Sequence, residues 1–210
     1  MNSYEFELDQ LMINNISKPI RTKLDIIIIL LYTLQYILWK PIEKNITARL
    51  KIVINKMKRV FYYLDTKMFS IVLPFSIKKV KAQIDIYDNL NDNLVIDNKI
   101  IAILISIFES ALNNDYRFFE ILDEHCLENN ITNCEKEYLS QIIYKLLFTE
   151  YGYVRYDDDI KREKSKIHPR FHFDLNATPN ATFKIGIDKA ISLDQFIDIL
   201  DITTECKYIK

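Results

Sequence analysis

The chain of 210 residues contains two glycines, Gly152 and Gly186. Glycine tolerates the positive φ angles that tight turns and close approaches of backbone to ligand require. Gly-rich phosphate loops, nucleotide-binding turns and β-sandwiches depend on such positions. The scarcity of glycine therefore argues against these architectures, and we expect asparagine to occupy many of the turns.

An apolar run near the N-terminus, DIIIILLYTLQYILWK (residues 25–40), bears on membrane insertion. Its apolar part, from Ile26 to Trp39, is 14 residues long and contains Gln35. A membrane-spanning helix needs about 20 residues, whereas a helix that is apolar on nearly all sides is typical of the centre of a fold. We therefore expect a buried helix here and no membrane contact.

Caps and prolines divide the N-terminal part into expected helices. Ser3 is expected to cap a first helix, which ends before Pro19. Pro41 fits the first turn of a later helix, which would end near Leu64, because the missing N–H of proline would be unpaired there in any case. Residues 66–97 carry short β-like runs and stay ambiguous.

The second half of the chain changes from a helical to a period-two pattern after Gly152. Helices are expected over residues 97–112, 115–128 and 132–148. The last of them begins with the capping-box spacing of Thr132 and Glu135. YVRY then predicts a strand, RFHFDL and TFKIGI predict a hairpin, LDQFIDIL predicts a short helix, and ECKYIK is a candidate final strand.

These patterns predict an α+β protein that is mainly α. A helical body of about six helices would be followed by a small antiparallel sheet with one short C-terminal helix. The helical body would comprise residues 1–150, with a basic segment at 18–81, and the small α+β end would comprise residues 151–210. Because no flexible linker separates them, we expect one compact domain.

Charge is distributed unevenly along the chain, although the net charge is −1. Residues 18–81 carry 14 basic and three acidic residues, and residues 82–210 carry 14 basic and 23 acidic residues. A helix over residues 41–64 would place basic side chains opposite an apolar stripe, namely those of Lys44, Arg49, Lys51, Lys56, Lys58 and Arg59. Such a one-signed face repels itself and predicts an anionic partner.

Several partners could neutralise this face. They are the acidic C-terminal part of the chain itself, the phosphate backbone of a nucleic acid, an acidic partner subunit and an anionic membrane. Phosphate contacts would carry no sequence preference. We expect a partner protein subunit, with nucleic acid bound through phosphate contacts, and no membrane.

The stretch KIHPRFHFDLN (residues 166–176) holds two of the three histidines. Alternate residues of a strand share a face, so His172 and Asp174 should lie together. They are the candidate catalytic pair, because histidine transfers protons near neutral pH and a carboxylate can orient it. Arg170 and Lys184, expected on the same face, are candidate anion-binding residues. The alternative is a polar sheet face without catalysis.

Metal and cofactor sites find little support in the sequence. The His-x-Asp pair opens a facial-triad pattern, which also needs a distant histidine. His168 is too far away along an extended chain, and Cys126, Cys134 and Cys206 lack the close pairs of zinc sites. We predict no metal and no cofactor. Three separated cysteines indicate reduced thiols in a cytoplasm.

We therefore predict a non-catalytic, nucleic-acid-associated accessory subunit of a bacterial multi-protein assembly, for example in phage defence. It would bind phosphate backbone through the basic helix. A first alternative is a nuclease or phosphotransfer-type enzyme centred on His172 and Asp174. A second is a structural subunit whose basic face meets an acidic partner protein.

Overall fold

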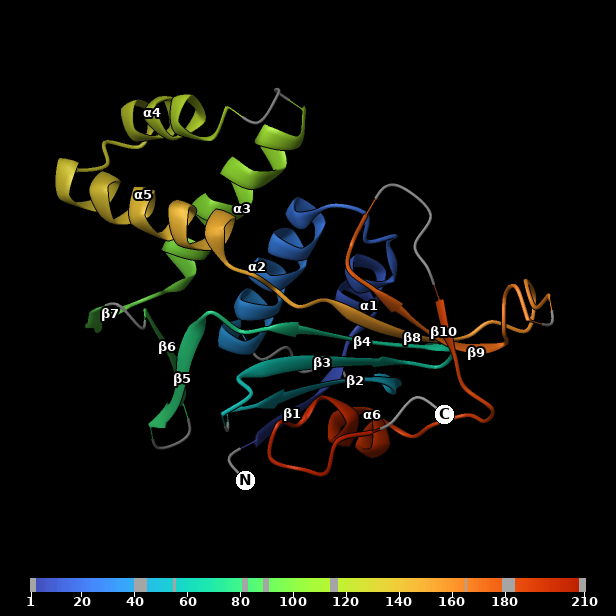
Figure 1. The fold of residues 1–210 in the computed structure, drawn as a ribbon. Coiled ribbons are helices and arrows are strands. Elements are labelled where there is room, and N and C mark those ends of the chain that lie inside the picture. Colours follow the sequence, from blue (N-terminus) through green and yellow to red (C-terminus); the bar gives the residue numbers. More distant parts are fainter. Residues whose placement is uncertain are drawn as a thin grey trace. The chain divides into compact units, whose positions relative to one another are not determined.

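The computed structural model describes residues 3–39, 45–54, 56–80, 83–88, 91–113, 117–164, 166–178 and 184–207. The chain forms two compact units, each assembled from separate segments (Figure 1). Unit 1 comprises Met1–Arg21, Glu43–Leu73 and Tyr151–Lys210. Unit 2 comprises Thr22–Ile42 and Pro74–Glu150.

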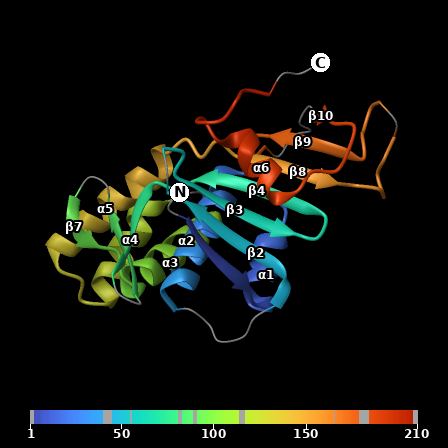
Figure 2. The same ribbon diagram turned by 90° about the horizontal axis from the view of Figure 1, so that it is seen from below.

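Unit 1 is built on a seven-stranded antiparallel sheet, seen from below in Figure 2, with the strand order β1-β2-β3-β4-β8-β9-β10. β4 pairs with β8, so the sheet joins strands from the two ends of the chain. The strands are β1 (Ser3–Leu8), β2 (Asn45–Val53), β3 (Arg59–Leu64), β4 (Lys67–Val72), β8 (Val154–Asp158), β9 (Phe171–Leu175) and β10 (Lys184–Gly186).

The two helices of unit 1, α1 (Gln10–Ser17) and α6 (Leu193–Leu200), lie on opposite faces of this sheet (Figure 1). On the α6 side, Phe196 is fully buried, and its ring centroid lies 5.9 Å from that of Phe61 and 6.1 Å from that of Phe173. Ser192 caps α6 in a capping box with Gln195. This aromatic cluster packs α6 against one face of the sheet. The candidate site described below lies on the other face.

Unit 2 combines four helices with a three-stranded sheet. The helices are α2 (Lys23–Trp39), α3 (Asn98–Asn113), α4 (Phe118–Glu128) and α5 (Asn133–Phe148), and the strands are β5 (Phe75–Val80), β6 (Gln83–Asp88) and β7 (Asn91–Val95). α2 packs against α3 and β6 and buries most of its side chains. The expected buried apolar helix is thus confirmed. In the described part of the chain, every helix is too short or too polar to span a membrane.

The predicted order of a helical body followed by a small sheet is wrong. The main sheet contains strands from both ends of the sequence, and β1 occupies the segment where Ser3 was expected to cap a helix. The first helix begins later, where the Asp9 side chain accepts a hydrogen bond from the backbone N–H of Met12.

The predicted basic helix over residues 41–64 is also wrong, because its described part forms β2 and β3. Ala48, Leu50 and Ile52 are buried and alternate with the exposed Arg49 and the half-buried Lys51, which is the pattern of a strand. Leu50 and Val53 also fit the apolar stripe of a helix, whereas the burial of Ala48 and Ile52 fits only the strand. Residues 41–44 lie outside the described residues.

The later elements were predicted more accurately. α3, α4 and α5 match the expected helices, and Thr132 and Glu135 form the expected capping box at α5. β9 and β10 form the expected hairpin. Residues 205–207 form no strand, and residues 208–210 lie outside the described part of the chain.

Candidate functional site

Three neighbouring strands bring polar side chains together on the sheet face opposite α6. In the register, Asp174 lies between Arg155 and Lys184. His172 pairs with Asp157 on β8. Because strand neighbours point to opposite faces, Tyr156 and Phe173 point instead into the core beneath α6. The expected separation of polar and apolar faces in the hairpin is confirmed.

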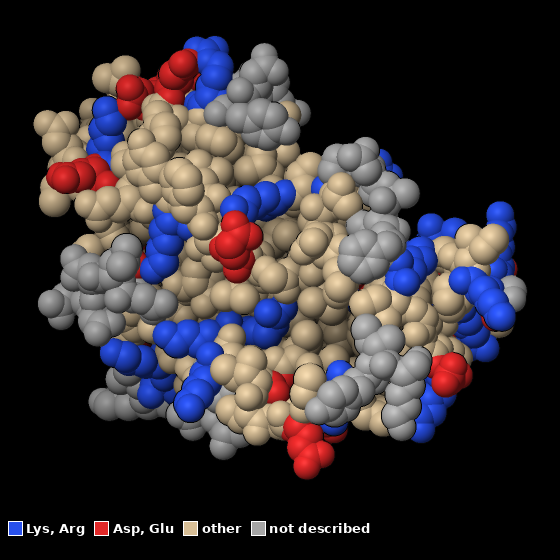
Figure 3. All heavy atoms as spheres, in the orientation of Figure 1, with Lys and Arg blue, Asp and Glu red and all other residues tan. Residues whose placement is uncertain are grey.

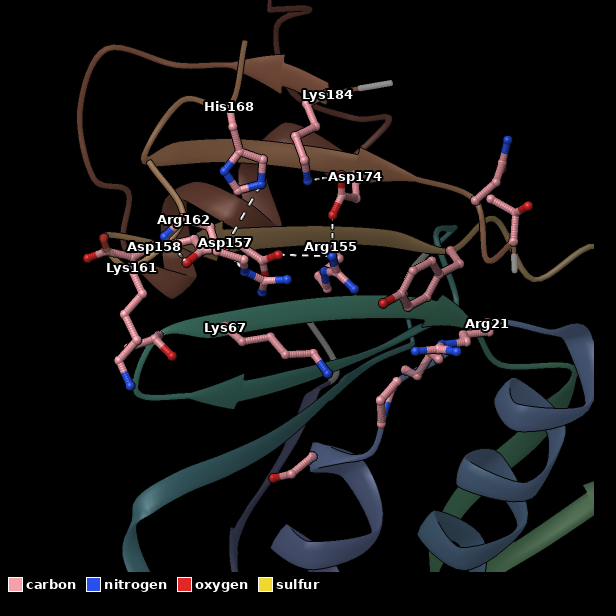
Figure 4. A pocket seen from close by; sticks show the side chains of 18 of the residues that line it. Arg21, Lys67, Arg155, Asp157, Asp158, Lys161, Arg162, His168, Asp174 and Lys184 are labelled. Atoms are coloured by element: carbon pink, nitrogen blue, oxygen red, sulfur yellow. Dashed lines mark hydrogen bonds and ion pairs between the residues drawn. The ribbon is translucent and has the colours of Figure 1, made fainter. Parts of the chain in front are cut away.

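Asp174 is the centre of a buried ion network (Figure 4). Lys184 Nζ lies 2.8 Å from Asp174 Oδ1, and Arg155 forms ion pairs with both Asp174 and Asp157. Burial alone would raise the pKa of Asp174, but the hydrogen bond from Lys184 and the charge of Arg155 outweigh it and lower this pKa. Asp174 is therefore held in its charged form.

His172 lies behind this network with its side chain fully buried. Its Nδ1 is 2.7 Å from the carbonyl oxygen of Pro169, which can only accept a hydrogen bond, so Nδ1 carries a proton. Its Nε2 is 2.8 Å from Lys184 Nζ and accepts from that ammonium. The ring of His172 thus joins the Pro169 carbonyl to Lys184 and helps to position Lys184, and it does not line the neighbouring pocket.

A metal could in principle be held by Asp157, His172 and Asp174. Their ligand atoms lie within 4.8 Å of one another. The cations that face these atoms are the side chains of Arg155 and Lys184, which already balance the two carboxylates. A metal ion would have to displace both side chains, so the donor set suits the chain's own cations better.

A pocket of about 860 Å³ opens beside this network. Its walls come from the segment after α1, from β4, from β8 and from the loop between β8 and β9. Six basic side chains line it, those of Arg21, Lys67, Arg155, Lys161, Arg162 and Lys184. They are accompanied by four acidic side chains, those of Asp157, Asp158, Asp159 and Asp174.

The walls of this pocket contain unsatisfied hydrogen-bonding groups. Among the described residues, five buried side-chain atoms lack a hydrogen-bond partner, and four of them belong to residues that line the pocket: Tyr153 Oη, Arg155 Nε, Asp159 Oδ2 and His168 Nδ1. The Arg155 guanidinium lies beside the Tyr153 hydroxyl, and its charge and polar contact act to lower the pKa of Tyr153, but the geometry falls short of a regular hydrogen bond. Asp159 Oδ2 has an ion-pair contact with Arg162 Nε at 2.8 Å. Such groups are rare in folded proteins and call for an explanation.

Lys67 carries a half-buried positive charge at the edge of the pocket. Its Nζ is 3.5 Å from the carbonyl oxygen of Ile16, and no carboxylate of a described residue lies within ion-pair distance. Burial, with a contribution from the charge of Arg155, lowers the pKa of Lys67 to about 8. An anion in the pocket would stabilise this charge.

The loop between β8 and β9 adds further positive charge. Lysine and arginine gather over this loop in the space-filling view, at the right-hand edge of the molecule (Figure 3). Four exposed basic residues contribute, Lys161, Arg162, Lys164 and Lys166. Lys161 and Arg162 also line the pocket, so the positive charge of the loop is continuous with that of the pocket.

The structure brings some of the predicted site residues together and separates others. Asp174 and Lys184 line the pocket, whereas His172 lies behind it. Arg170 forms an ion pair with Asp158, with Nε 2.6 Å from Oδ1, and does not line the pocket. Arg170 is engaged by Asp158 where the chain bends before β9, and its role as an anion-binding residue stays a prediction.

Those of the predicted nucleic-acid-binding residues that the structure describes lie outside this pocket. Arg49 lies 3.6 Å from Glu5, and Lys51 lies 3.6 Å from Asp194, so carboxylates of the chain face both. Arg59 donates to Ser70, and burial lowers its pKa to about 10. Lys56 and Lys58 are exposed, and Lys44 lies outside the described residues.

Comparisons with protein-family models, curated proteins and solved structures find no match to this chain. Its function has to be argued from its own residues.

Proposed function

We propose that this protein binds the phosphate backbone of a single-stranded nucleic acid in the pocket beside β8, β9 and β10. Nucleic acid was predicted to bind to a basic helix over residues 41–64. The present proposal places it instead at the pocket on the sheet face opposite α6. The rest of the prediction, an accessory subunit of a bacterial assembly located in the cytoplasm, stays part of this proposal.

The observation that carries the proposal is the concentration of unsatisfied groups in one charged pocket. A buried hydrogen-bonding group without a partner costs about 1–3 kcal/mol, which a suitable ligand recovers. Arg155 Nε is a donor, and burial raises the pKa of Tyr153 to about 12, so that its hydroxyl keeps a proton to donate. Donors of this kind favour a ligand rich in acceptor oxygens, such as a phosphate.

The positions of the basic residues favour a strand over a single small anion. Lys67 lies in the pocket, while Lys164 and Lys166 extend the positive surface along the neighbouring loop. A basic groove that follows a phosphate backbone is typical of proteins that bind single strands. The unsatisfied atoms lie within the pocket wall, so the side chains that bear them must rotate as the strand binds.

The experiment is fluorescence anisotropy with a labelled DNA strand of about 12 nucleotides. Lys67→Met combined with Arg162→Ala should raise the Kd at least about tenfold, because two charge-assisted phosphate contacts are lost. The dependence of log Kd on log salt should fall by about 0.7 for each lost contact.

A matched control separates this pocket from general surface charge. Lys56→Ala combined with Lys79→Ala removes the same charge from two exposed positions outside the pocket, and it should leave the Kd within about twofold. An equal loss of affinity in both double variants, or no binding by the wild type, contradicts the proposal.

A further inference from the structure

We propose that the same pocket cleaves RNA, with His168 as the general base, Lys67 as the general acid and the 2′-hydroxyl of the substrate as the nucleophile. This inference rests on the proposed function, because the strand must first bind in the pocket. It adds a reaction and restricts the substrate class from single-stranded nucleic acid to RNA.

His168 is the histidine that reaches the pocket. Its side chain is 19% exposed and its Nδ1 is buried, which leaves Nε2 as the accessible ring nitrogen. Nε2 lies 4.0 Å from Asp159 Oδ2, close enough for the carboxylate to stabilise an imidazolium. An imidazole in this setting can take a proton from a bound hydroxyl.

Lys67 lies on the other side of the pocket from His168 (Figure 4). Lys67 begins β4, and His168 lies in the loop that leads into β9, the strand on the other side of β8. Arg155 and Asp157, on β8, lie between the two side chains (Figure 4). A phosphate held by Arg155 would therefore have a proton acceptor on one side and a proton donor on the other, as an in-line displacement requires.

The pKa of Lys67, lowered to about 8 by burial, suits this role. An ammonium group with an ordinary lysine pKa donates its proton weakly near neutral pH, whereas one with a pKa near the working pH donates readily and remains mostly protonated. The groups that face Lys67 are Arg155, which lowers its pKa further, and Asp157, which raises it.

The reaction balances without a further reactant. His168 Nε2 takes the proton of the 2′-hydroxyl, and the 2′-oxygen forms a bond to the adjacent phosphorus. The bond from phosphorus to the 5′-oxygen breaks, and that oxygen keeps the electron pair and takes a proton from the Lys67 ammonium. The products are a 2′,3′-cyclic phosphate and a 5′-hydroxyl, and proton exchange with water restores both side chains.

The proposed reaction uses one base and one acid and needs no metal ion, which agrees with the charges of the site. Asp157, His172 and Asp174 are the described residues whose ligand atoms converge, and Arg155 and Lys184 already face them as counter-ions. The internal 2′-hydroxyl needs no metal ion to activate it, so the two carboxylates of this network need not hold a metal during the reaction. The network positions Arg155 and Lys184 along the pocket wall.

The experiment incubates the full-length protein with end-labelled RNA in EDTA and analyses the product ends. The wild type should release 2′,3′-cyclic phosphate ends and should leave DNA and 2′-O-methyl RNA intact. His168→Asn should lower the cleavage rate at least about 100-fold. The control is His125→Asn, at a histidine of unit 2 that contacts Ser106, and it should cleave at the wild-type rate.

Binding of 2′-O-methyl RNA, measured in parallel by anisotropy, separates the two proposals. Binding without any cleavage between pH 5 and pH 9 overturns the catalytic inference and leaves the binding proposal standing. Absence of binding overturns both. Cleavage that persists in His168→Asn, that requires a divalent metal or that acts equally on DNA also overturns the inference, and circular dichroism of each variant shows that it is folded.

Discussion

At the scale of single residues, the charge of Lys67 is proposed to favour ligand binding but lowers the stability of the folded protein. Burial lowers its pKa to about 8, compared with about 10.4 in an unfolded chain. Below pH 8 the Lys67 ammonium stays charged in the folded state although burial disfavours the charge. This lowers the free energy of unfolding by on the order of 2–3 kcal/mol. Between these two pKa values the unfolded chain binds more protons than the folded one, so stability contributed by this residue rises with pH.

Lys67→Met should therefore stabilise the protein. We expect the free energy of unfolding at pH 7 to increase by about 1–3 kcal/mol, and the difference from the wild type to shrink by about half at pH 9.5. Urea titrations at both pH values measure it. A matched control is Lys78→Met. The ammonium of Lys78 lies 4.8 Å from the Tyr87 ring centroid, and that of Lys67 lies 4.9 Å from the Phe69 ring centroid. Lys78 is exposed, however, so this control loses the same type of contact without removing a desolvated charge. A loss of stability in Lys67→Met at pH 7 would contradict this account of the buried charge.

At the scale of elements, Asp174 joins β8, β9 and β10 through Arg155 and Lys184. Asp174→Asn should lower the free energy of unfolding by about 3–5 kcal/mol, because it leaves two cations without their shared carboxylate. The pKa of Asp174 is lowered in the folded state, so its stabilisation is complete above the unfolded-state pKa of about 3.9 and disappears as the pH falls through the folded-state value.

Urea titrations near pH 7 and pH 3 measure this contribution. Adding Lys184→Met to Asp174→Asn should restore part of the lost stability at pH 7, since one of the two uncompensated charges is then removed. Equal stability of wild type and Asp174→Asn at pH 7 would show that the network contributes nothing.

The elements themselves were predictable where one local pattern decided them. The capping boxes at Thr132 and Ser192 identify the starts of α5 and α6, and the alternation in RFHFDL identifies the two faces of β9. β2 was not predicted, because Leu50 and Val53 fit a helical stripe and the period-two burial of Ala48, Leu50 and Ile52 runs over only a few residues. The pairing partner decides between the two, and β1 and β3 supply it.

At the scale of the whole molecule, the candidate site depends on contacts between distant segments. Asp174 and Lys184 could be predicted because they share one hairpin. Lys67 could not, since β4 meets β8 through a pairing that no local pattern encodes. Nor did the sequence show that His168 rather than His172 would reach the pocket, because this depends on the bend just before β9 and on the contact between the Pro169 carbonyl and His172.

The most direct test of the central claim is the NMR signal of the Arg155 Nε–H group during titration with a DNA strand. This group has no hydrogen-bond partner among the described residues, whereas the Nε–H of Arg59 donates to Ser70 Oγ at 2.9 Å. If the pocket holds the phosphate backbone, the Arg155 signal, assigned by its loss in Arg155→Lys, shifts as the strand binds and the Arg59 signal stays in place. If the strand binds while the Arg155 signal does not move, the nucleic acid lies elsewhere and the account is wrong.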